Sequence, residues 1–102
     1  MKELDKVIKG RGEVKGYTFT QVKMSKYAYI YAQKYDETGE VHSYEVFERK
    51  INKQFDCVSY PKSTSFGSWA WSCKAYNDAV RIFDEINKRR EGKEDEEEEE
   101  TD

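Results

Sequence analysis

The segment KYAYIYAQKYD (residues 26–36) constrains the fold of this chain more than any other. Tyrosines stand at positions 27, 29, 31 and 35, and the even positions between them hold Ala28, Ile30 and Ala32. An alternation with a period of two is typical of a β-strand, in which successive side chains point to opposite faces. The segment therefore predicts a strand with an aromatic face and a small apolar face.

A turn follows this strand and sets its register with the next one. In DETGE (residues 36–40), Gly39 tolerates the left-handed conformation that a three-residue loop over residues 37–39 requires. This loop predicts the pairs Tyr35–Val41, Gln33–Ser43, Tyr31–Glu45, Tyr29–Phe47 and Tyr27–Arg49 on the tyrosine face, with Ala32–Tyr44 and Ile30–Val46 on the other face. Directly opposed residues share a face, so the tyrosine face is expected to mix rings with charges.

Three further segments have the pattern of strands. Residues 17–24 alternate with a change of parity that predicts a β-bulge near Thr20 and Gln21. Residues 41–51 continue from the turn. Residues 54–61 form an expected fourth strand, which ends at a proline that cannot continue a central ladder.

Two shorter segments are less regular. Residues 2–10 carry apolar side chains at helical spacing ahead of a glycine, which predicts a short N-terminal helix. Residues 69–72 (WAWS) are either a further short strand or an ordered entry to the following helix. An extended backbone there would place Trp69 and Trp71 on one side. Core anchors are the expected role of both indoles, and base stacking by one of them is the alternative.

The strongest helical pattern runs from about Lys74 to Arg90. Apolar residues recur there at the spacing of an amphipathic helix, at Tyr76, Ala79, Val80, Phe83 and Ile86. Ser72 is the expected N-cap, and Gly92 is the expected end. A helix approaches small side chains closely, so we expect it to pack on the face of Ala28, Ile30 and Ala32 and to leave the tyrosine face open.

Charge divides the chain into a basic part and an acidic end. Residues 1–93 hold all 18 Lys and Arg against 13 Asp and Glu, a formal charge of +5, whereas the last nine residues, EDEEEEETD, hold eight acidic groups. A block of like charges repels itself and stays unfolded. We therefore expect an N-terminal segment (residues 1–12), a single α+β domain (residues 13–92) and a disordered acidic tail (residues 93–102). The tail is a solubilising extension, a recruitment segment for a basic partner, or a competitor lying over the basic surface of its own domain.

The expected fold class is α+β: a curved antiparallel sheet of about four strands with one C-terminal helix packed on one face. Groups that carry chemistry are scarce. His42 is the only histidine, and Cys57 and Cys73 have no further ligands at metal-binding spacing. We therefore expect no enzyme, no metal and no cofactor. The lack of a long apolar run and of a secretory signal predicts a cytoplasmic protein with reduced thiols and no membrane partner.

Aromatic rings beside basic residues suggest a binding surface. In β-sheet proteins that hold single-stranded nucleic acid, bases stack on rings while Lys and Arg neutralise phosphates. The residues expected to act in this way are Tyr27, Tyr29, Tyr31 and Phe47 for stacking, and Lys26, Lys34, Arg49 and Lys50 for phosphates. Tyr35, Lys23 and Lys53 lie on or near the same hairpin. The alternative is that the tyrosine row packs against a second layer of the protein itself.

The layout also resembles known families. The strands followed by one helix, the aromatic sheet and the basic segments resemble small Whirly and coactivator-type folds over about residues 14–102. The terminal EDEEEEETD resembles the acidic tails of bacterial and phage single-stranded-DNA-binding proteins, although those tails usually end in an apolar pair and this one ends in Thr101 and Asp102. The resemblance implies a non-enzymatic module for single-stranded nucleic acid with an autoinhibitory or partner-recruiting tail. Residues 55–71 are also similar to small uncharacterised proteins of bacteriophages and gut bacteria, which implies no activity.

A second hypothesis assigns the tyrosine face to a protein partner, because tyrosine is enriched at protein interfaces. The chain would then be a phage- or plasmid-encoded modulator of a host protein, or it would form a homodimer through this face.

Overall fold

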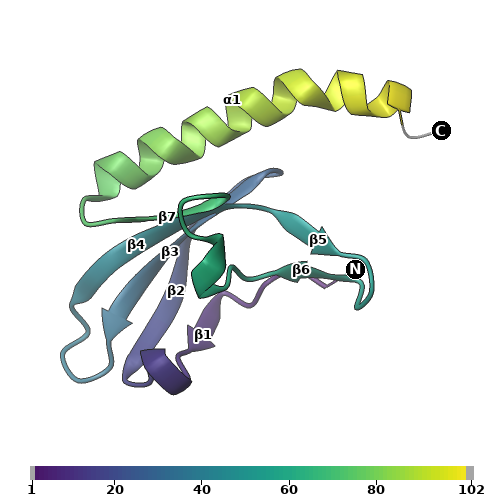
Figure 1. Cartoon of the computed structure of the whole chain (residues 1–102). Coiled ribbons are helices and arrows are strands. Elements are labelled where there is room, and N and C mark those ends of the chain that lie inside the picture. The colour runs from purple at the N-terminus through teal and green to yellow at the C-terminus, as the bar shows by residue number, and fades with distance from the viewer. Residues whose placement is uncertain (1, 101–102) are drawn as a thin grey trace.

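The computed structural model describes residues 2–100, and the side chains of residues 2–92. A five-stranded antiparallel sheet has the strand order β1-β2-β3-β4-β7. Its strands are β1 (Val7–Lys9), β2 (Tyr17–Met24), β3 (Ala28–Tyr35), β4 (Val41–Glu48) and β7 (Ala70–Cys73). One helix, α1 (Tyr76–Glu100), lies across one face of the sheet (Figure 1). The predicted α+β class, with a C-terminal helix packed on an antiparallel sheet, is confirmed.

The register between β3 and β4 is confirmed along most of its length. The pairs from Tyr29–Phe47 to Gln33–Ser43 are those expected from the turn sequence. The turn itself is one residue longer than predicted, because the Tyr35 N–H donates to the Glu40 carbonyl at 2.9 Å and encloses four residues. Lys34 then pairs with Val41, so His42 is the extra residue of a β-bulge that restores the expected register. Gly39 has the predicted positive φ, +77°.

The helix packs where the small side chains allow it. Ala28, Ile30 and Val46 of the sheet meet α1 in a buried group that we call the helix-side cluster, completed by Ala79, Phe83 and Ile86. Alanine leaves room for a helix to approach a sheet closely. The predicted apolar stripe of the helix, and the face of the sheet that it covers, are therefore confirmed.

The opposite face of the sheet is also buried, which corrects the expectation that it is open. Tyr29, Tyr31 and Phe47 are each 0% exposed and form the centre of a second core, the tyrosine cluster, with Phe19, Val58 and Ala70. Two segments cover this cluster. One is the N-terminal arm (residues 2–14), and the other is the crossing loop (residues 60–69), and both supply partly buried apolar side chains: Leu4, Ile8 and Val14 from the arm, and Tyr60, Phe66 and Trp69 from the loop.

Hydrogen bonds from the tyrosines hold the N-terminal arm in place. The Tyr31 hydroxyl donates to the Asp5 carbonyl at 2.7 Å and accepts from Gln21 Nε2 at 3.0 Å. The Tyr29 hydroxyl donates to the Glu3 carboxylate. A buried phenol needs a polar partner, and the arm supplies one to each ring. The row therefore consists of tyrosines that serve as core residues while their hydroxyls fasten a second layer.

The arm is a strand where we expected a short helix. Val7, Ile8 and Lys9 pair with Thr20, Phe19 and Thr18 of β2, so part of the N-terminal segment joins the sheet as its edge strand. A short isolated helix is only marginally stable, whereas the edge of β2 offers the arm backbone hydrogen-bond partners. Gly10 permits the close turn after β1, since a Cβ atom there would lie 2.0 Å from the Val14 carbonyl oxygen.

The segment expected to be the fourth strand lies outside the main sheet. β6 (Cys57–Ser59) pairs with β5 (Lys50–Asn52) in a separate two-stranded hairpin, which extends beyond the end of the sheet in Figure 1. The N-terminus lies beside β6, where the Val58 N–H donates to the Lys2 carbonyl at 2.9 Å. The fifth strand of the sheet is β7, one of the two alternatives for residues 69–72. Trp69 precedes β7 and packs against the tyrosine cluster, while Trp71 packs on the helix side, so the indoles do not share a face.

Both ends of the helix differ from the prediction. Ser72 is paired with Glu45 inside β7 and cannot cap α1, which begins at Tyr76. The helix continues past Gly92 to Glu100. The expectation of a disordered acidic tail concerns residues 93–102, whose side chains lie outside the described part of the chain. Cys57 and Cys73 are both free and half-buried.

Candidate functional site

The residues predicted to bind nucleic acid fall into three separate places. Tyr29, Tyr31 and Phe47 lie in the tyrosine cluster, where Phe47 stacks on Tyr31 with ring centroids 5.7 Å apart and on Tyr29 at 5.6 Å. Rings without any exposed surface cannot stack on a base. Their predicted stacking role is therefore wrong, because the arm and the crossing loop occupy the face that we expected a ligand to use.

Lys34 is also remote from the other predicted residues. It lies at the end of β3 nearest the turn, paired with Thr18 and Val41. The remaining cations lie near the opposite end of the strand, beside Ala28. A single phosphate site cannot use Lys34 together with them.

The other four predicted residues come together. Lys26, Tyr27, Arg49 and Lys50 line one hollow of about 430 Å³, which we call the basic hollow. Ile51, Lys53 and Arg90 complete its lining. The bend before β3, the segment from the residue after β4 through β5 to Lys53, and the helix α1 therefore all contribute to one concave surface. Five of the seven lining residues are Lys or Arg.

Tyr27 turns away from the tyrosine row and towards the helix. It precedes β3, in a bend where the Ser25 hydroxyl oxygen accepts the N–H groups of Tyr27 and Ala28 at 3.2 and 3.1 Å. The same hydroxyl donates to Asn87 Oδ1 of α1 at 2.6 Å. Strand alternation does not hold in a bend, so the ring packs against the helix-side cluster and stays half-exposed.

Two cations lie over the ring of Tyr27. Lys26 Nζ is 5.5 Å and the Arg90 guanidinium carbon is 5.9 Å from the ring centroid. Both distances are within the range of a cation–π interaction. Arg90, which no sequence pattern marks as a site residue, reaches the hollow from the part of α1 that follows the apolar stripe. Only its position in space relates it to residue 27.

The cations of the hollow differ in how far they are neutralised. Arg49 forms an ion pair with Glu3 through two hydrogen bonds, and these bonds, with the one from Tyr29, lower the pKa of Glu3. Arg90 lies 4.0 Å from Glu48, which is paired more closely with Arg89 at 2.9 Å. Lys50 lies 5.4 Å from the Trp69 ring centroid. Neither Lys50 nor Lys53 has an ion pair among the described residues, so both charges remain available to a ligand.

An exposed aromatic side chain lies on the hairpin that carries these two lysines. Phe55 is 68% exposed, the largest exposure of any large apolar residue described, and Ile51 is 47% exposed. The Asn52 side-chain oxygen accepts the N–H groups of Gln54 and Phe55 at 3.0 and 3.3 Å and shapes the turn. The sequence KINKQFD (residues 50–56) contains a signal for this site, because it places a phenylalanine among basic residues. The expected fourth strand, residues 54–61, includes this phenylalanine, whereas the structure places it in a turn.

The described residues offer no sign of a metal centre or a membrane span. Residues 2–92 contain no group of three or more His, Cys, Asp or Glu side chains placed to hold a metal ion. None of the helices within residues 2–100 satisfies both the length and the hydropathy needed to span a lipid bilayer. A scan against protein-family models found no match to this chain, and searches of the curated proteins and of the solved structures found none either.

Proposed function

We propose that this protein binds single-stranded nucleic acid at the basic hollow and the adjoining hairpin, without catalysing a reaction on it. One observation carries the proposal: cationic side chains from three segments that are distant in sequence converge on one concave surface. Proteins that bind single strands without sequence preference combine such a basic groove with rings on which bases stack.

The chemistry of the surface divides between phosphates and bases. Lys50 and Lys53, which have no ion pair among the described residues, supply the positive charge for phosphate groups, and Lys26 lies beside them in the hollow, whereas Arg49 is already paired with Glu3. Phe55 supplies the exposed ring, and stacking of one base on an aromatic side chain contributes about 1–3 kcal/mol. Lys26 and Lys50 keep the phosphate-binding role predicted from the sequence. Phe55 takes the place of the predicted stacking residues.

The acidic end of the chain is proposed to compete with the nucleic acid. Eight acidic groups occur among residues 94–102, which begin four residues after Arg90 of the hollow. A polyanion attached to the same chain is present at a high effective concentration. The tail would therefore weaken binding of a second polyanion at low salt.

The proposal is tested by titrating fluorescein-labelled oligothymidylate with the full-length protein and following the anisotropy at two salt concentrations. We expect saturable binding that weakens steeply as salt rises, because neutralised phosphates release counterions. If neither the full-length protein nor a chain ending at Lys93 binds at low salt, the proposal is wrong. A Phe55→Ala variant separates the two components, since it should weaken binding without changing the salt dependence.

A protein partner is the second candidate, because Phe55 and Ile51 present apolar surface next to Lys50 and Lys53, which form no ion pair within the described part of the chain. The buried tyrosine row takes no part in this alternative. A stoichiometric complex with an acidic protein that survives high salt, combined with a lack of oligonucleotide binding, would favour it.

A further inference from the structure

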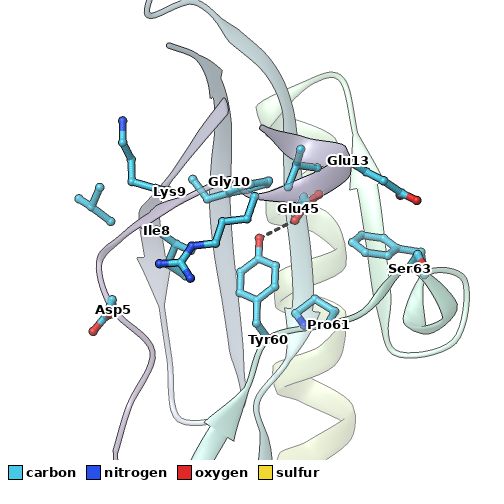
Figure 2. Close-up of a pocket in the computed structure, with 14 residues that line it drawn as sticks. Asp5, Ile8, Lys9, Gly10, Glu13, Glu45, Tyr60, Pro61 and Ser63 are labelled. Carbon is cyan, nitrogen blue, oxygen red and sulfur yellow. Dashed lines mark hydrogen bonds between the residues drawn. The ribbon is translucent and has the colours of Figure 1, made fainter. Parts of the chain in front are cut away.

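A second cavity lies on the tyrosine side of the sheet, far from the helix. Its volume is about 790 Å³, within the range of pockets that hold small organic ligands. The N-terminal arm forms one side, the crossing loop forms the other, and Phe19 and Glu45 of the sheet also line it. Residues at its rim, among them Asp5, Arg11 and Ser63, are exposed, so the cavity opens to solvent. Figure 2 shows Tyr60 and Pro61 facing Ile8 and Gly10 across it.

The inner walls of this cavity are mostly apolar, whereas its rim carries charged and polar side chains. Ile8 and Val14 come from the arm, Phe19 comes from β2, and Pro61 and Phe66 come from the crossing loop. Glu45 belongs to β4, where it lies between Tyr31 of β3 and Ser72 of β7. A carboxylate is thus placed on the face of the sheet that elsewhere holds the buried rings.

Tyr60 holds one oxygen of this carboxylate in a fixed position. Its hydroxyl donates to Glu45 Oε1 at 2.5 Å, the dashed line in Figure 2. The Tyr60 ring makes edge contacts with Phe19, Tyr31 and Phe47, at centroid distances of 5.8, 5.6 and 5.1 Å. A side chain packed on three rings has little freedom to move, so the carboxylate is held in one orientation.

The charge of Glu45 is not balanced within the described part of the chain, where no Lys, Arg or His pairs with it. Burial raises the pKa of Glu45, and the hydrogen bond from Tyr60 opposes that rise. Buried carboxylates are normally paired with a cation because desolvation of an isolated charge is costly. Here the hydrogen bond from one neutral hydroxyl compensates only part of that cost.

The rim does not supply the missing cation. Lys9 is turned to Thr18 and Asp36, at 3.1 and 3.6 Å. Lys9 and Arg11 lie at the rim together with two acidic residues, Asp5 and Glu13, so the formal charges at the rim balance. An approaching cation is therefore not repelled by the entrance.

We propose that this cavity binds a small organic cation, an amine attached to an aromatic or aliphatic body. The ammonium group would pair with Glu45, and the body would contact the apolar walls. Three observations lead to this class of ligand: a carboxylate without a cation, apolar walls on both sides of it, and a volume that suits a small molecule. An organic anion would be repelled by the Glu45 carboxylate. A neutral ligand would leave the charge unpaired.

The test compares three ligands that differ in one functional group: phenethylamine, phenethyl alcohol and hydrocinnamate. Each is titrated into the ¹⁵N-labelled protein, and binding is followed by the amide shifts of Phe19, Glu45 and Tyr60. We expect saturable shifts from the amine, with an affinity at least about tenfold above that of the alcohol, which corresponds to one close charge pair in a partly buried site. The anion is expected not to bind.

Two variants identify the carboxylate responsible. Glu45→Gln keeps the shape and can still accept from Tyr60, and it should remove the tenfold preference for the amine over the alcohol. Glu13→Gln, at the rim, is the matched control and should leave the preference unchanged. Equal losses in both variants would mean that only the general charge of the region attracts the amine, and the proposal would be wrong. Preferential binding of hydrocinnamate or of the alcohol to the wild-type protein would overturn it without any variant.

Discussion

The tyrosine cluster and the basic hollow are built from the same short segment, yet they have opposite relations to solvent. Tyr29 and Tyr31 are fully buried, whereas Tyr27, two residues earlier, is half-exposed among cations. The first two rings lie in a strand whose face is covered by the arm and the crossing loop. The third lies in a bend and turns to the other side of the sheet. The comparison shows that the exposure of an aromatic ring depends on what covers its face.

The polar groups of the two regions also have different roles. In the tyrosine cluster, the phenol hydroxyls are donors that fasten the arm to the sheet. In the basic hollow, the polar groups are cations, of which Lys50 and Lys53 have no ion pair among the residues described. Satisfied groups stabilise the fold, and unsatisfied cations are available to a ligand. The predictions below test this division.

The largest effect is expected from emptying the tyrosine cluster. Phe47→Ala removes a ring that packs against Tyr29, Tyr31, Tyr60 and Trp69, and it should lower the free energy of unfolding by about 3–5 kcal/mol. Tyr27→Ala should cost about 1 kcal/mol, since its ring is only partly buried. Urea denaturation followed by circular dichroism measures both. Equal losses of unfolding free energy in the two variants would contradict the distinction between a buried cluster and a partly exposed surface.

A smaller effect, on binding, is expected from the hollow. Replacing Lys26, Lys50 and Lys53 together by Gln should weaken oligonucleotide binding about tenfold or more at low salt. It should also reduce the slope of log affinity against log salt by about 2, because each phosphate contact to a single strand contributes about 0.7.

The matched control for this variant is the triple replacement of Lys15, Lys34 and Lys74 by Gln. These lysines lie near the other end of the sheet, where Lys74 Nζ contacts the His42 carbonyl at 3.3 Å. The net charge changes by the same amount in both variants. If the control loses as much affinity, binding depends on overall charge and the basic hollow has no special role.

Removing one phenol hydroxyl should have a smaller, pH-dependent effect on stability. Burial and the hydrogen bond to Glu3 raise the pKa of Tyr29 to about 12 from 10.0. The folded protein therefore keeps this proton where the unfolded chain loses it, and rising pH favours unfolding between about pH 10 and 12. Tyr29→Phe should cost about 1 kcal/mol at neutral pH, the usual contribution of one hydrogen bond.

The sign of the pH dependence makes this prediction specific. The difference in stability between wild type and Tyr29→Phe should shrink as pH rises through that window, measured by urea denaturation at several pH values. A constant difference would show that the hydroxyl titrates alike in the folded and unfolded states.

The smallest effect is expected from the acidic end of the chain. A protein that ends at Lys93 lacks all eight acidic groups of residues 94–102, and it should bind oligothymidylate about threefold more tightly at low salt. The gain should vanish at high salt, where screening removes the competition. Weaker binding by the truncated protein would show that the tail supports binding and does not compete with it.

Local patterns predicted much of the architecture. The alternation in residues 26–36, together with Gly39 in the turn, predicted the central hairpin and most of its register. The helical stripe ending at Ile86 predicted which face α1 covers. These features depend on periodicity within one segment, so the sequence carries them directly. The local pattern of the N-terminal arm predicts a helix, because its actual partner, the edge of β2, is nine or more residues away in the sequence.

The candidate site was predicted only in part. Lys26, Tyr27, Arg49 and Lys50 do share one hollow, since they flank paired strands. Arg90 and Phe55 were missed, because nothing local places a helix residue or a hairpin tip beside residue 27. Glu45 and Tyr60 were missed as well. They are fifteen residues apart and meet only because the crossing loop returns over the sheet.

By itself, the sequence determined which residues alternate, where the chain turns and which stripe of the helix is apolar, since the backbone geometry of one segment converts these patterns into local structure. Only the tertiary structure decided which face of the sheet meets solvent. That outcome depends on whether segments distant along the chain find hydrogen-bond partners and apolar surface on that face, and the hydroxyls of Tyr29 and Tyr31 supply the partners that hold the arm there.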